Sequence, residues 1–430
     1  MTAPEARPGR TWVAELGRAV GAEARVCGFA TPTSAGLALT DPTGTVTLLG
    51  GPGGGGPPGR GILAGSAVVA TGRVVGSGDR PALEVDTLEV LGPAVDPPPL
   101  GSGASLEERL DWRYLELRQP RHRLVFEVQT TLERAMRQWW HEHRFLEIHS
   151  PKLKGVPNQS GRELFTLDYF GRPAYLAQSP QFYKQMAMAA GFERVFEVGP
   201  VFRANPLRTT RHDTEFTSVD MELAWIDSHH DVMALEERWL REAVAAVVAE
   251  HGPAIEEHYG RRLRVPEVPF PRVSMGEAQR VLAGKGHVST AAEGDLDAEG
   301  ERLLGEHVRA EVDHELVFVT EYPASVRPFY HRRLEEGSPL TRSFDLLWNG
   351  LEVTTGAQRE HRHDRLVAQA GERNPSRLEA ARPYLDFFRH GCPPHGGCGV
   401  GLTRLLACLL GVTDVREVTL LPRDRDRLGP

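Results

Sequence analysis

The pattern of apolar and polar residues divides the chain into two regions of different character. In the first, short β-prone runs alternate with turn signals: ARVCGFA, GLALTDPTG and TVTLL, then SAVVATGRVV and ALEVDTLEVL. Five short strands at this spacing are typical of a small β-barrel, and the oligonucleotide-binding (OB) fold is one candidate. The glycine-rich stretch between them is predicted to be a loop without phosphate-binding function, because it lacks a Gly-Lys-Ser/Thr ending and no helix follows.

The second region follows a stretch rich in proline, glycine and serine, VDPPPLGSGAS. Apolar residues recur at helical spacing from Arg121 to Arg144, which predicts a long amphipathic helix. Strand-like segments follow, among them RVFEVGPVFRA, FTSVDMELAWI and SFDLLWNGLEVTTGAQRE, and CGVGLTRLL runs from a strand into a helix. The pattern predicts an α+β domain built on antiparallel strands. We therefore expect a barrel in residues 1–94, a linker in 95–108 and the α+β domain in 109–430.

Composition narrows the class of protein. The chain has 430 residues, 40% hydrophobic and 25% charged, which is typical of a globular protein with two or three domains. The net charge of -8 means that any contact with nucleic acid must come from local basic patches. Four cysteines do not make a disulfide framework, and no apolar run is long enough for a signal peptide or a membrane span. We expect a cytoplasmic protein that is not inserted in a membrane.

A basic hairpin is the first segment that suggests chemistry. In VFRANPLRTTRHDTEFTSVDME, Arg203 ends one strand, a loop follows, and the next strand begins near Phe216. Cations at both bases of such a hairpin can clamp phosphates, and an aromatic ring can stack on adenine. Basic hairpin loops are also commonly just solvated, so this segment alone is weak. The cations of the loop are Arg208, Arg211 and His212.

Two further segments suggest a metal and a nucleotide. Asp345 and Glu352 are seven residues apart, so only a turn at Asn349-Gly350 can bring them together. Paired carboxylates of this kind can hold Mg²⁺ on ATP phosphates, with Thr355 as a further oxygen ligand, but they can equally flank a surface hairpin. In GCPPHGGCGVGLTRLL, small residues let the backbone approach a ligand before Arg404 opens a helix.

Together, the order and content of these segments resemble the three signature motifs of class II aminoacyl-tRNA synthetases. The first is the long helix ending in FLEIHSPKL with Pro151, which builds the dimer interface in that family. The second is FRANPLRTTRHDTEF, where the resemblance places Arg203 on the ATP α-phosphate and Phe216 against adenine. The third is GVGLTRL, whose Arg404 would meet the γ-phosphate. YLAQSPQFYKQMAMAAGFERVFEVGPVFRA, GLEVTTGAQREH and PPHGGCGVG look like the aspartate enzymes within this class.

This resemblance implies use of ATP and Mg²⁺, aspartate and tRNA as substrates, and a homodimer. ATP contacts are expected from Arg203, Arg211, His212, Phe216, Glu352 and Arg404, and metal contacts from Asp345, Glu352 and Thr355. Lys184 and Arg359 would bind the aspartate side chain, with Arg359 gripping the carboxylate bidentately. Asparagine would then leave a buried cation unpaired, at a cost of several kcal/mol. Asp220 would orient Lys184, and Gln159, Ser179 and Gln181 would lie near the amino acid's backbone groups.

The chain also departs from the aspartate enzymes. They usually carry acids where this chain has Asn205, Thr403 and Gln159, and the acid at the last position meets the substrate's ammonium group. In the barrel, the positions that read anticodon bases in related enzymes hold Gly36, Thr40 and Thr47. Without a stacking ring or a cation, about 1 to 3 kcal/mol per base is missing.

Three functions are consistent with these residues. The first is an aspartate-activating enzyme that charges tRNA, with relaxed discrimination between the aspartate and asparagine tRNAs. The second is a paralogue that adenylates aspartate or an analogue and transfers it to another acceptor, such as an amine. The third is an inactive regulatory or RNA-binding paralogue, which has no reason to retain the nucleotide and metal residues.

Overall fold

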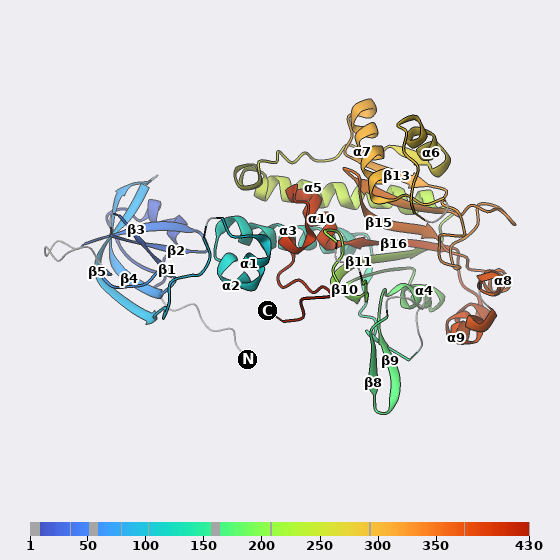
Figure 1. Ribbon diagram of the computed structural model, residues 1–430, viewed down its shortest axis with the longest axis horizontal. Coiled ribbons are helices and arrows are strands. Elements are labelled where there is room, and N and C mark those ends of the chain that lie inside the picture. Colours follow the sequence, from blue (N-terminus) through green and yellow to red (C-terminus); the bar gives the residue numbers. More distant parts are fainter. Residues whose placement is uncertain are drawn as a thin grey trace. The chain divides into compact units, whose positions relative to one another are not determined.

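The computed structural model describes residues 9–34, 36–50, 59–78, 80–101, 103–155, 164–206, 209–291, 294–373 and 375–429. The chain forms two compact units, Met1–Arg123 and Leu124–Pro430 (Figure 1). Between the last strand of the first unit, which ends at Gly92, and the helix that begins at Leu106, the described residues form no helix or strand. The finer division into barrel, linker and α+β domain stays a prediction.

The first unit is a closed barrel in the strand order β1-β2-β3-β5-β4, as predicted. Apolar residues alternate inward along its strands, including Val26, Leu39, Val46 and Leu83, which are at most 1% exposed. Its elements are η1 (Val13–Arg18), β1 (Glu23–Thr33), β2 (Gly36–Asp41), β3 (Gly44–Gly50), β4 (Ala67–Ser77), β5 (Arg80–Gly92), α1 (Leu106–Asp111) and α2 (Arg113–Glu116).

The three barrel positions expected to read bases share one face of β2 and β3. Thr40 pairs with Thr45, and Ala38 pairs with Thr47, so strand alternation places Gly36, Thr40 and Thr47 on the same side. The opposite side carries the buried leucines and valines of the barrel core. The hydroxyl groups of Thr40 and Thr45 lie 2.9 Å apart, within hydrogen-bonding distance. The face therefore offers hydroxyl and methyl groups at these positions.

The second unit is built on an eight-stranded sheet in the order β12-β13-β14-β15-β16-β11-β10-β6. The strands of this unit are β6 (Leu146–Glu147), β7 (Leu153–Lys154), β8 (Thr166–Tyr169), β9 (Arg172–Leu176), β10 (Arg194–Phe202), β11 (Glu215–Ala224), β12 (Arg272–Ser274), β13 (Leu316–Thr320), β14 (Ser343–Trp348), β15 (Leu351–Gln358) and β16 (His395–Gly401). Its helices are α3 (Pro120–Glu142), α4 (Gln181–Ala189), α5 (His229–Tyr259), α6 (Met275–Gly284), α7 (Ala298–Val312), α8 (His363–Arg373), α9 (Pro375–Leu385), η2 (Asp386–His390), α10 (Leu402–Leu410) and η3 (Val415–Val418).

The six central strands, from β13 to β10, are antiparallel, which confirms the predicted α+β fold. The two edge strands differ from the prediction, because β12 and β6 each pair in parallel with their neighbours. The predicted turn at Asn349-Gly350 joins β14 to β15, and both residues have positive φ, 51° and 78°. This is the conformation that a two-residue β-hairpin needs and that the Asn-Gly dipeptide favours.

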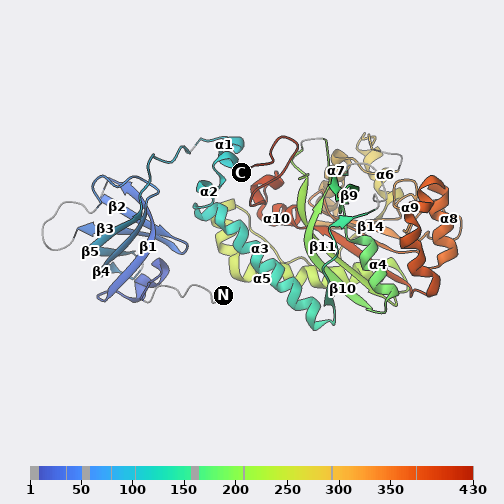
Figure 2. The same ribbon diagram turned by 90° about the horizontal axis from the view of Figure 1, so that it is seen from below.

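Helices α3 and α5 run together along the sheet (Figure 2). Trp140 of α3 lies 5.4 Å from Trp239 of α5 and 4.8 Å from Phe196 of β10, measured between ring centroids. These rings are part of the main core, which also takes in α10. The core packs against one face of the sheet. It therefore holds the strands, and the residues on their opposite face, in fixed positions.

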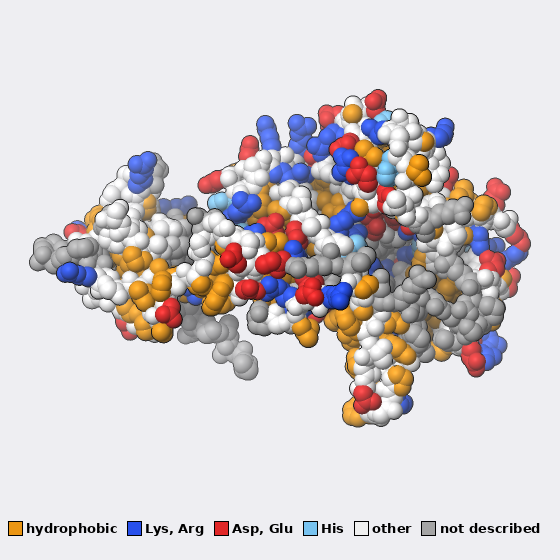
Figure 3. Space-filling view, viewed as in Figure 1, with side chains coloured by type: hydrophobic (Ala, Val, Ile, Leu, Met, Phe, Trp, Pro, Cys, Tyr) orange, Lys and Arg blue, Asp and Glu red, His pale blue; other side chains and the backbone are white. Residues whose placement is uncertain are grey.

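A small sheet in the order β7-β9-β8 ends in a hairpin whose tip projects from this unit. Tyr169 and Phe170 form the tip, and Phe170 is 87% exposed. Apolar side chains on the hairpin are visible in the space-filling view (Figure 3). No helix among the described residues combines the length and the hydrophobicity that crossing a membrane requires.

A buried acid, Glu236, lies on the side of α5 that faces the sheet. It is 0% exposed, and neither carboxylate oxygen has a hydrogen-bond partner among the described residues. Burial raises the pKa of Glu236 to about 8, and the neighbouring acids Glu237 and Asp345 add to the shift. The side chain is therefore mostly uncharged at neutral pH.

The substitution Glu236→Gln is expected to stabilise the protein at alkaline pH. Between the ordinary glutamate pKa of 4.5 and about 8, the folded chain keeps a proton that the unfolded chain has lost, so stability falls as pH rises through this window. Glutamine cannot ionise and removes this loss. Thermal unfolding should show a midpoint higher than wild type by about 3 °C or more at pH 8.5, with a smaller difference at pH 5.

Glu242→Gln is the matched control, because Glu242 lies on the same helix with its side chain 56% exposed. It should leave the pH dependence unchanged. A Glu236→Gln variant whose unfolding midpoint follows that of the wild type at every pH would contradict the assignment of a protonated Glu236.

Candidate active site

Four charged side chains form a buried cluster on the sheet. Lys184 of α4 is 0% exposed, and its Nζ lies 2.7 Å from Asp220 Oδ1 and 3.4 Å from Glu222 Oε2. It also donates hydrogen bonds to the carbonyl oxygens of Met221 and Cys398 at 3.2 and 3.0 Å. The ammonium group has only three N–H donors, so these contacts occupy all of them.

Arg359 enters the same cluster from the end of β15. Its Nε donates to Glu222 Oε1 at 3.0 Å, and its Nη2 donates to Gln181 Oε1 at 3.0 Å and to the Gly397 carbonyl at 2.9 Å. Its Nη1 lies 2.9 Å from His331 Nε2. Lys184 and Arg359, which are far apart in the sequence, therefore meet on one carboxylate, that of Glu222.

This arrangement differs from the expected bidentate grip in a specific way. At least four of the five N–H groups of Arg359 already have acceptors among the described residues, so at most one N–H remains for a ligand. The two cations are balanced by Asp220 and Glu222, so asparagine would not leave either of them unpaired. Burial alone would raise the pKa of Glu222, but Arg359 and Lys184 hold it below its ordinary value, so it stays charged.

Local backbone geometry explains why these groups meet. Asp220 and Glu222 are two residues apart on β11, so they point to the same face of the sheet. On the neighbouring strand β16, a Cβ atom at Gly397 would overlap the Glu222 carboxylate and the Met221 carbonyl. Glycine at this position therefore makes room for the acid.

Several of the residues expected to bind a nucleotide lie on the β10–β11 hairpin. Arg203 follows β10, its backbone N–H bonds the Thr214 carbonyl at 2.8 Å, and its guanidinium carbon is 5.3 Å from the centroid of the Phe216 ring. Phe216 pairs with Val201 across the hairpin. The cation and the ring that were expected to hold phosphate and adenine are thus neighbours, as a single nucleotide requires.

A ring of hydrogen bonds connects Arg211, Glu301, Glu352 and Arg404. Arg404 Nε donates to the Arg211 carbonyl at 3.2 Å, and its Nη1 donates to the Glu352 carbonyl at 2.9 Å. Glu301 of α7 accepts from Arg211 Nη2 and from the Glu352 backbone N–H at 3.1 Å. Burial, together with the nearby Glu352, raises the pKa of Glu301 to about 7.

His212 lies at the base of the same loop. Its Nδ1 is 2.7 Å from Thr209 Oγ1, and burial together with Arg404 and Arg211 lowers the pKa of His212 to about 4. The imidazole is therefore neutral at pH 7 and can offer a hydrogen bond to a phosphate oxygen without a charge.

The three expected metal ligands are close together. Asp345 is paired with Thr355 across the β14–β15 hairpin, and Thr355 Oγ1 donates to Glu352 Oε1 at 3.0 Å. Glu352 and Thr355 are three residues apart and would point to opposite faces of a regular strand. The register shifts between Leu346 and Leu347, where β15 has one extra residue, and this bulge turns both side chains to the same face.

The chemistry of this group fits a magnesium ion. Asp345 Oδ1 is buried without a hydrogen-bond partner among the described residues, while Oδ2 pairs with Arg327. Burial raises the pKa of Asp345 to about 6, with Arg327 opposing the shift and Glu352 adding to it. An unsatisfied carboxylate oxygen next to a second acid and a hydroxyl is a set of hard oxygen ligands. The described part of the chain has no cluster of three or more His, Cys, Asp or Glu side chains suited to a metal.

Two predicted residues are not among the described ones, and a third has a local hydrogen bond. Gln159 and Arg208 lie outside the described residues. Ser179 Oγ accepts a hydrogen bond from the backbone N–H of Gln181 at 3.1 Å, so it also shapes the start of α4. The roles assigned to all these side chains remain predictions.

Three charged residues of the site, Glu222, Glu301 and Arg327, were not predicted from the sequence. Glu222 could have been found, because it follows Asp220 at strand spacing. Arg327 and Glu301 gave no such signal, since each comes from a distant segment and reaches its partner only through the tertiary fold.

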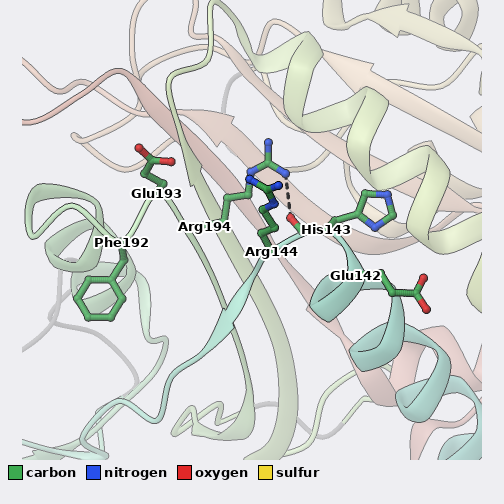
Figure 4. Close-up of a pocket in the computed structure, with 6 residues that line it drawn as sticks. All are labelled: Glu142, His143, Arg144, Phe192, Glu193 and Arg194. Atoms are coloured by element: carbon green, nitrogen blue, oxygen red, sulfur yellow. Dashed lines mark hydrogen bonds between the residues drawn. The ribbon is translucent and has the colours of Figure 1, made fainter.

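A cavity of about 320 Å³ lies away from these groups, at the end of α3 and the start of β10. It is lined by Glu142, His143, Arg144, Phe192, Glu193 and Arg194, and Arg194 donates to the His143 carbonyl at 2.9 Å (Figure 4). None of the predicted site residues lines it. Its two glutamates are matched by two arginines, with His143 beside them, so its charge does not identify a ligand.

Comparison with known proteins agrees with this geometry. The sequence model of the family tRNA synthetases class II (D, K and N) matches residues 105–425, and the chain belongs to this family. It is 43% identical to the aspartate--tRNA(Asp/Asn) ligase of Aeropyrum pernix over 81% of this chain and 79% of that protein. It is 42% identical to the aspartate--tRNA(Asp) ligase of Thermococcus kodakarensis over 76% of this chain and 74% of the relative.

A solved structure is similar over almost the whole length. The asparaginyl-tRNA synthetase from Pyrococcus horikoshii complexed with asparaginyl-adenylate superposes with a TM-score of 0.86 at 29% identity. The match covers 98% of this chain and 99% of the other.

The substitution Asp345→Asn is expected to weaken divalent-metal binding in the presence of ATP by about tenfold, because it removes one of two anionic ligands. Titration of Mn²⁺, followed by its electron paramagnetic resonance signal, measures this without reference to activity. Glu352→Gln should have a similar effect.

Asp364→Asn is the control, since Asp364 lies on α8 with its side chain 78% exposed. Because Asp345→Asn also removes the partner of Arg327, thermal unfolding is measured in parallel. Folded variants at both acids that bind Mn²⁺ with wild-type affinity would exclude the metal assignment.

Proposed function

We propose that this protein activates aspartate with ATP and joins it to tRNA. The observation that carries the proposal is the convergence of Lys184 and Arg359 on one buried carboxylate beside a nucleotide clamp. The named functions of the relatives from Aeropyrum pernix and Thermococcus kodakarensis support the same substrate.

The preference for aspartate over asparagine follows from the hydrogen-bonding groups around the cluster. The remaining N–H of Arg359 is a donor, and it makes a stronger, charge-assisted hydrogen bond to a carboxylate oxygen than to the neutral amide oxygen of asparagine. Because both cations are already balanced, the expected discrimination is about ten- to a hundredfold, which is less than an unpaired buried charge would give.

The first half-reaction forms an aspartyl-adenylate. A substrate α-carboxylate oxygen attacks the α-phosphorus of ATP, a P–O bond forms, and the bond to pyrophosphate breaks. Arg203 and Arg404 neutralise phosphate charge, Phe216 stacks on adenine, and no protein nucleophile is required. Asp345, Glu352 and Thr355 would hold Mg²⁺, which neutralises charge on the phosphates when bound.

The second half-reaction transfers the aspartyl group. A hydroxyl of the tRNA 3′ ribose attacks the acyl carbon and AMP leaves. The barrel face with Gly36, Thr40 and Thr47 has neither a ring nor a cation at those positions. We therefore propose that the protein discriminates weakly between the aspartate and asparagine tRNAs.

The same barrel face supports a second candidate, transfer to an acceptor other than tRNA. The replacement of acids of the aspartate enzymes by Asn205 and Thr403 favours the same candidate. Both candidates require the adenylate, so they differ only in the second half-reaction.

Aspartate-dependent exchange of labelled pyrophosphate into ATP is the expected activity. Arg359→Ala should raise the KM for aspartate by about a hundredfold or abolish exchange, because it removes the charge and four hydrogen bonds of the pocket. Arg365→Ala, on the exposed surface of α8, is the control.

Charging with purified aspartate and asparagine tRNAs then separates the candidates. Similar rates of aspartyl transfer to both would support relaxed discrimination. Exchange without any aspartyl-tRNA would remove tRNA as the acceptor, and full exchange by folded Arg359→Ala would refute the pocket assignment.

We also propose a homodimer. Large apolar side chains are exposed on the segment that follows the long helix and on the strands beside it: Leu146 (53%), Leu153 (49%), Phe170 (87%), Phe192 (46%) and Trp225 (68%). Exposed apolar groups on and near the edge strand β6 favour association.

Light scattering should give a mass twice that of the 47.4 kDa chain. Leu146→Glu, which puts a charge on the edge strand β6, should shift the protein toward the monomer. Val288→Glu, at a site 84% exposed outside this segment, is the control. A monomeric wild type at micromolar concentration would refute the dimer.

A further inference from the structure

Helix α7 reaches the nucleotide site through a close contact between backbones. A Cβ atom at Gly305 of α7 would overlap the backbone of Gly350 in the β14–β15 turn, and one at Gly350 would overlap the backbone of Arg302. Only glycines allow this approach, and Gly350 also has a positive φ of 78°. The contact brings the first turns of α7 against β15, where the metal ligands lie.

This close backbone contact places Glu301 in the candidate site. It is 9% exposed, and its Oε2 accepts two hydrogen bonds, one from Arg211 Nη2 and one from the Glu352 backbone N–H at 3.1 Å. The first partner belongs to the expected phosphate clamp, and the second belongs to the expected metal ligands. A single carboxylate therefore ties together the two halves of the ATP site.

The same two segments are connected a second time by Arg404. Its guanidinium bonds the backbone carbonyls of Arg211 and Glu352, so the Arg211 backbone and side chain are held from opposite sides. The one side-chain hydrogen bond of Arg211 among the described residues uses Nη2, and the Arg211 side chain is 22% exposed. Nε and Nη1 therefore remain for an anion.

We propose that Glu301 is a positioning residue for ATP, which holds the Arg211 guanidinium in the orientation that binds phosphate and fixes β15 beside it. This inference rests on the proposed function. A long arginine side chain loses much rotamer freedom when it binds a ligand, and a partner that orients it beforehand reduces that cost. If Glu301 instead competed with phosphate for Arg211, its removal would strengthen ATP binding.

The test is the affinity for ATP in the presence of Mg²⁺, measured by calorimetry on the full chain. Glu301→Gln keeps the shape but removes the charge, and it should raise the Kd for ATP and the KM for ATP in pyrophosphate exchange by about tenfold. The KM for aspartate should stay within about twofold of wild type, because neither of the described hydrogen bonds of Glu301 reaches the Lys184–Arg359 cluster. Glu301→Asp, which keeps the charge, should be intermediate.

A double-mutant cycle with Arg211→Met distinguishes positioning from a structural role. The double variant should lose clearly less affinity for ATP than the product of the two single losses, because Glu301 acts mainly through Arg211. Glu299→Gln is the matched control, since it lies in the same turn of α7 with its side chain 51% exposed and pairs only with Arg302 in the described contacts. It should bind ATP as the wild type does.

Several outcomes would overturn the proposal. The first is an ATP affinity that is unchanged or tighter in Glu301→Gln. The second is an equal rise in the KM for ATP and the KM for aspartate. The third is a loss of ATP affinity in the double variant that equals the product of the two single losses. Should Glu301→Gln not fold, Glu301→Asp and Arg211→Met still give the comparison. A wild type that binds ATP but shows no aspartate-dependent exchange would refute the proposed function and leave the positioning test intact.

Discussion

The Glu222 carboxylate, buried between Lys184 and Arg359, is the interaction on which the rest of the site depends. A buried charge is costly unless it is paired and hydrogen-bonded, and here two acids and two bases satisfy one another. Arg359 alone connects α4, β11 and β16 through Gln181, Glu222 and Gly397. The cluster therefore fixes three elements relative to one another and leaves little room for other arrangements, because moving any member would expose an unpaired charge.

Beside this cluster, the nucleotide half of the site is held mainly by backbone geometry. The Asn349-Gly350 turn and the bulge in β15 place Asp345, Glu352 and Thr355 together. Arg404 uses its guanidinium on two backbone carbonyls, and Glu301 binds a side chain and a backbone N–H. The proposed amino-acid pocket and the proposed ATP site are thus built differently. The first depends on charge pairs, and the second on strand register and close backbone contacts.

Two of the departures from the aspartate enzymes, Thr403 and the barrel positions, lie outside the described hydrogen bonds of both networks. Thr403 is next to Arg404 but takes no part in its described hydrogen bonds, and the outward face of β2 and β3 belongs to the barrel. Substitutions at these positions therefore leave the proposed adenylating residues undisturbed. The physical reason is that the proposed first half-reaction uses only the cluster and the clamp, whereas an acceptor would be recognised on surfaces beyond them.

The sequence by itself determined the barrel, the α+β class and the hairpin turn at Asn349-Gly350, and it indicated most residues of the candidate site. These follow from strand alternation, turn chemistry and motif spacing, which are local properties of the chain. Only the tertiary structure decided that Glu222 lies between Lys184 and Arg359, that a bulge aligns Glu352 with Thr355, and that Glu301 reaches Arg211 across ninety residues. Which carboxylate neutralises which cation depends on distances between segments remote in sequence, and no local pattern encodes such distances.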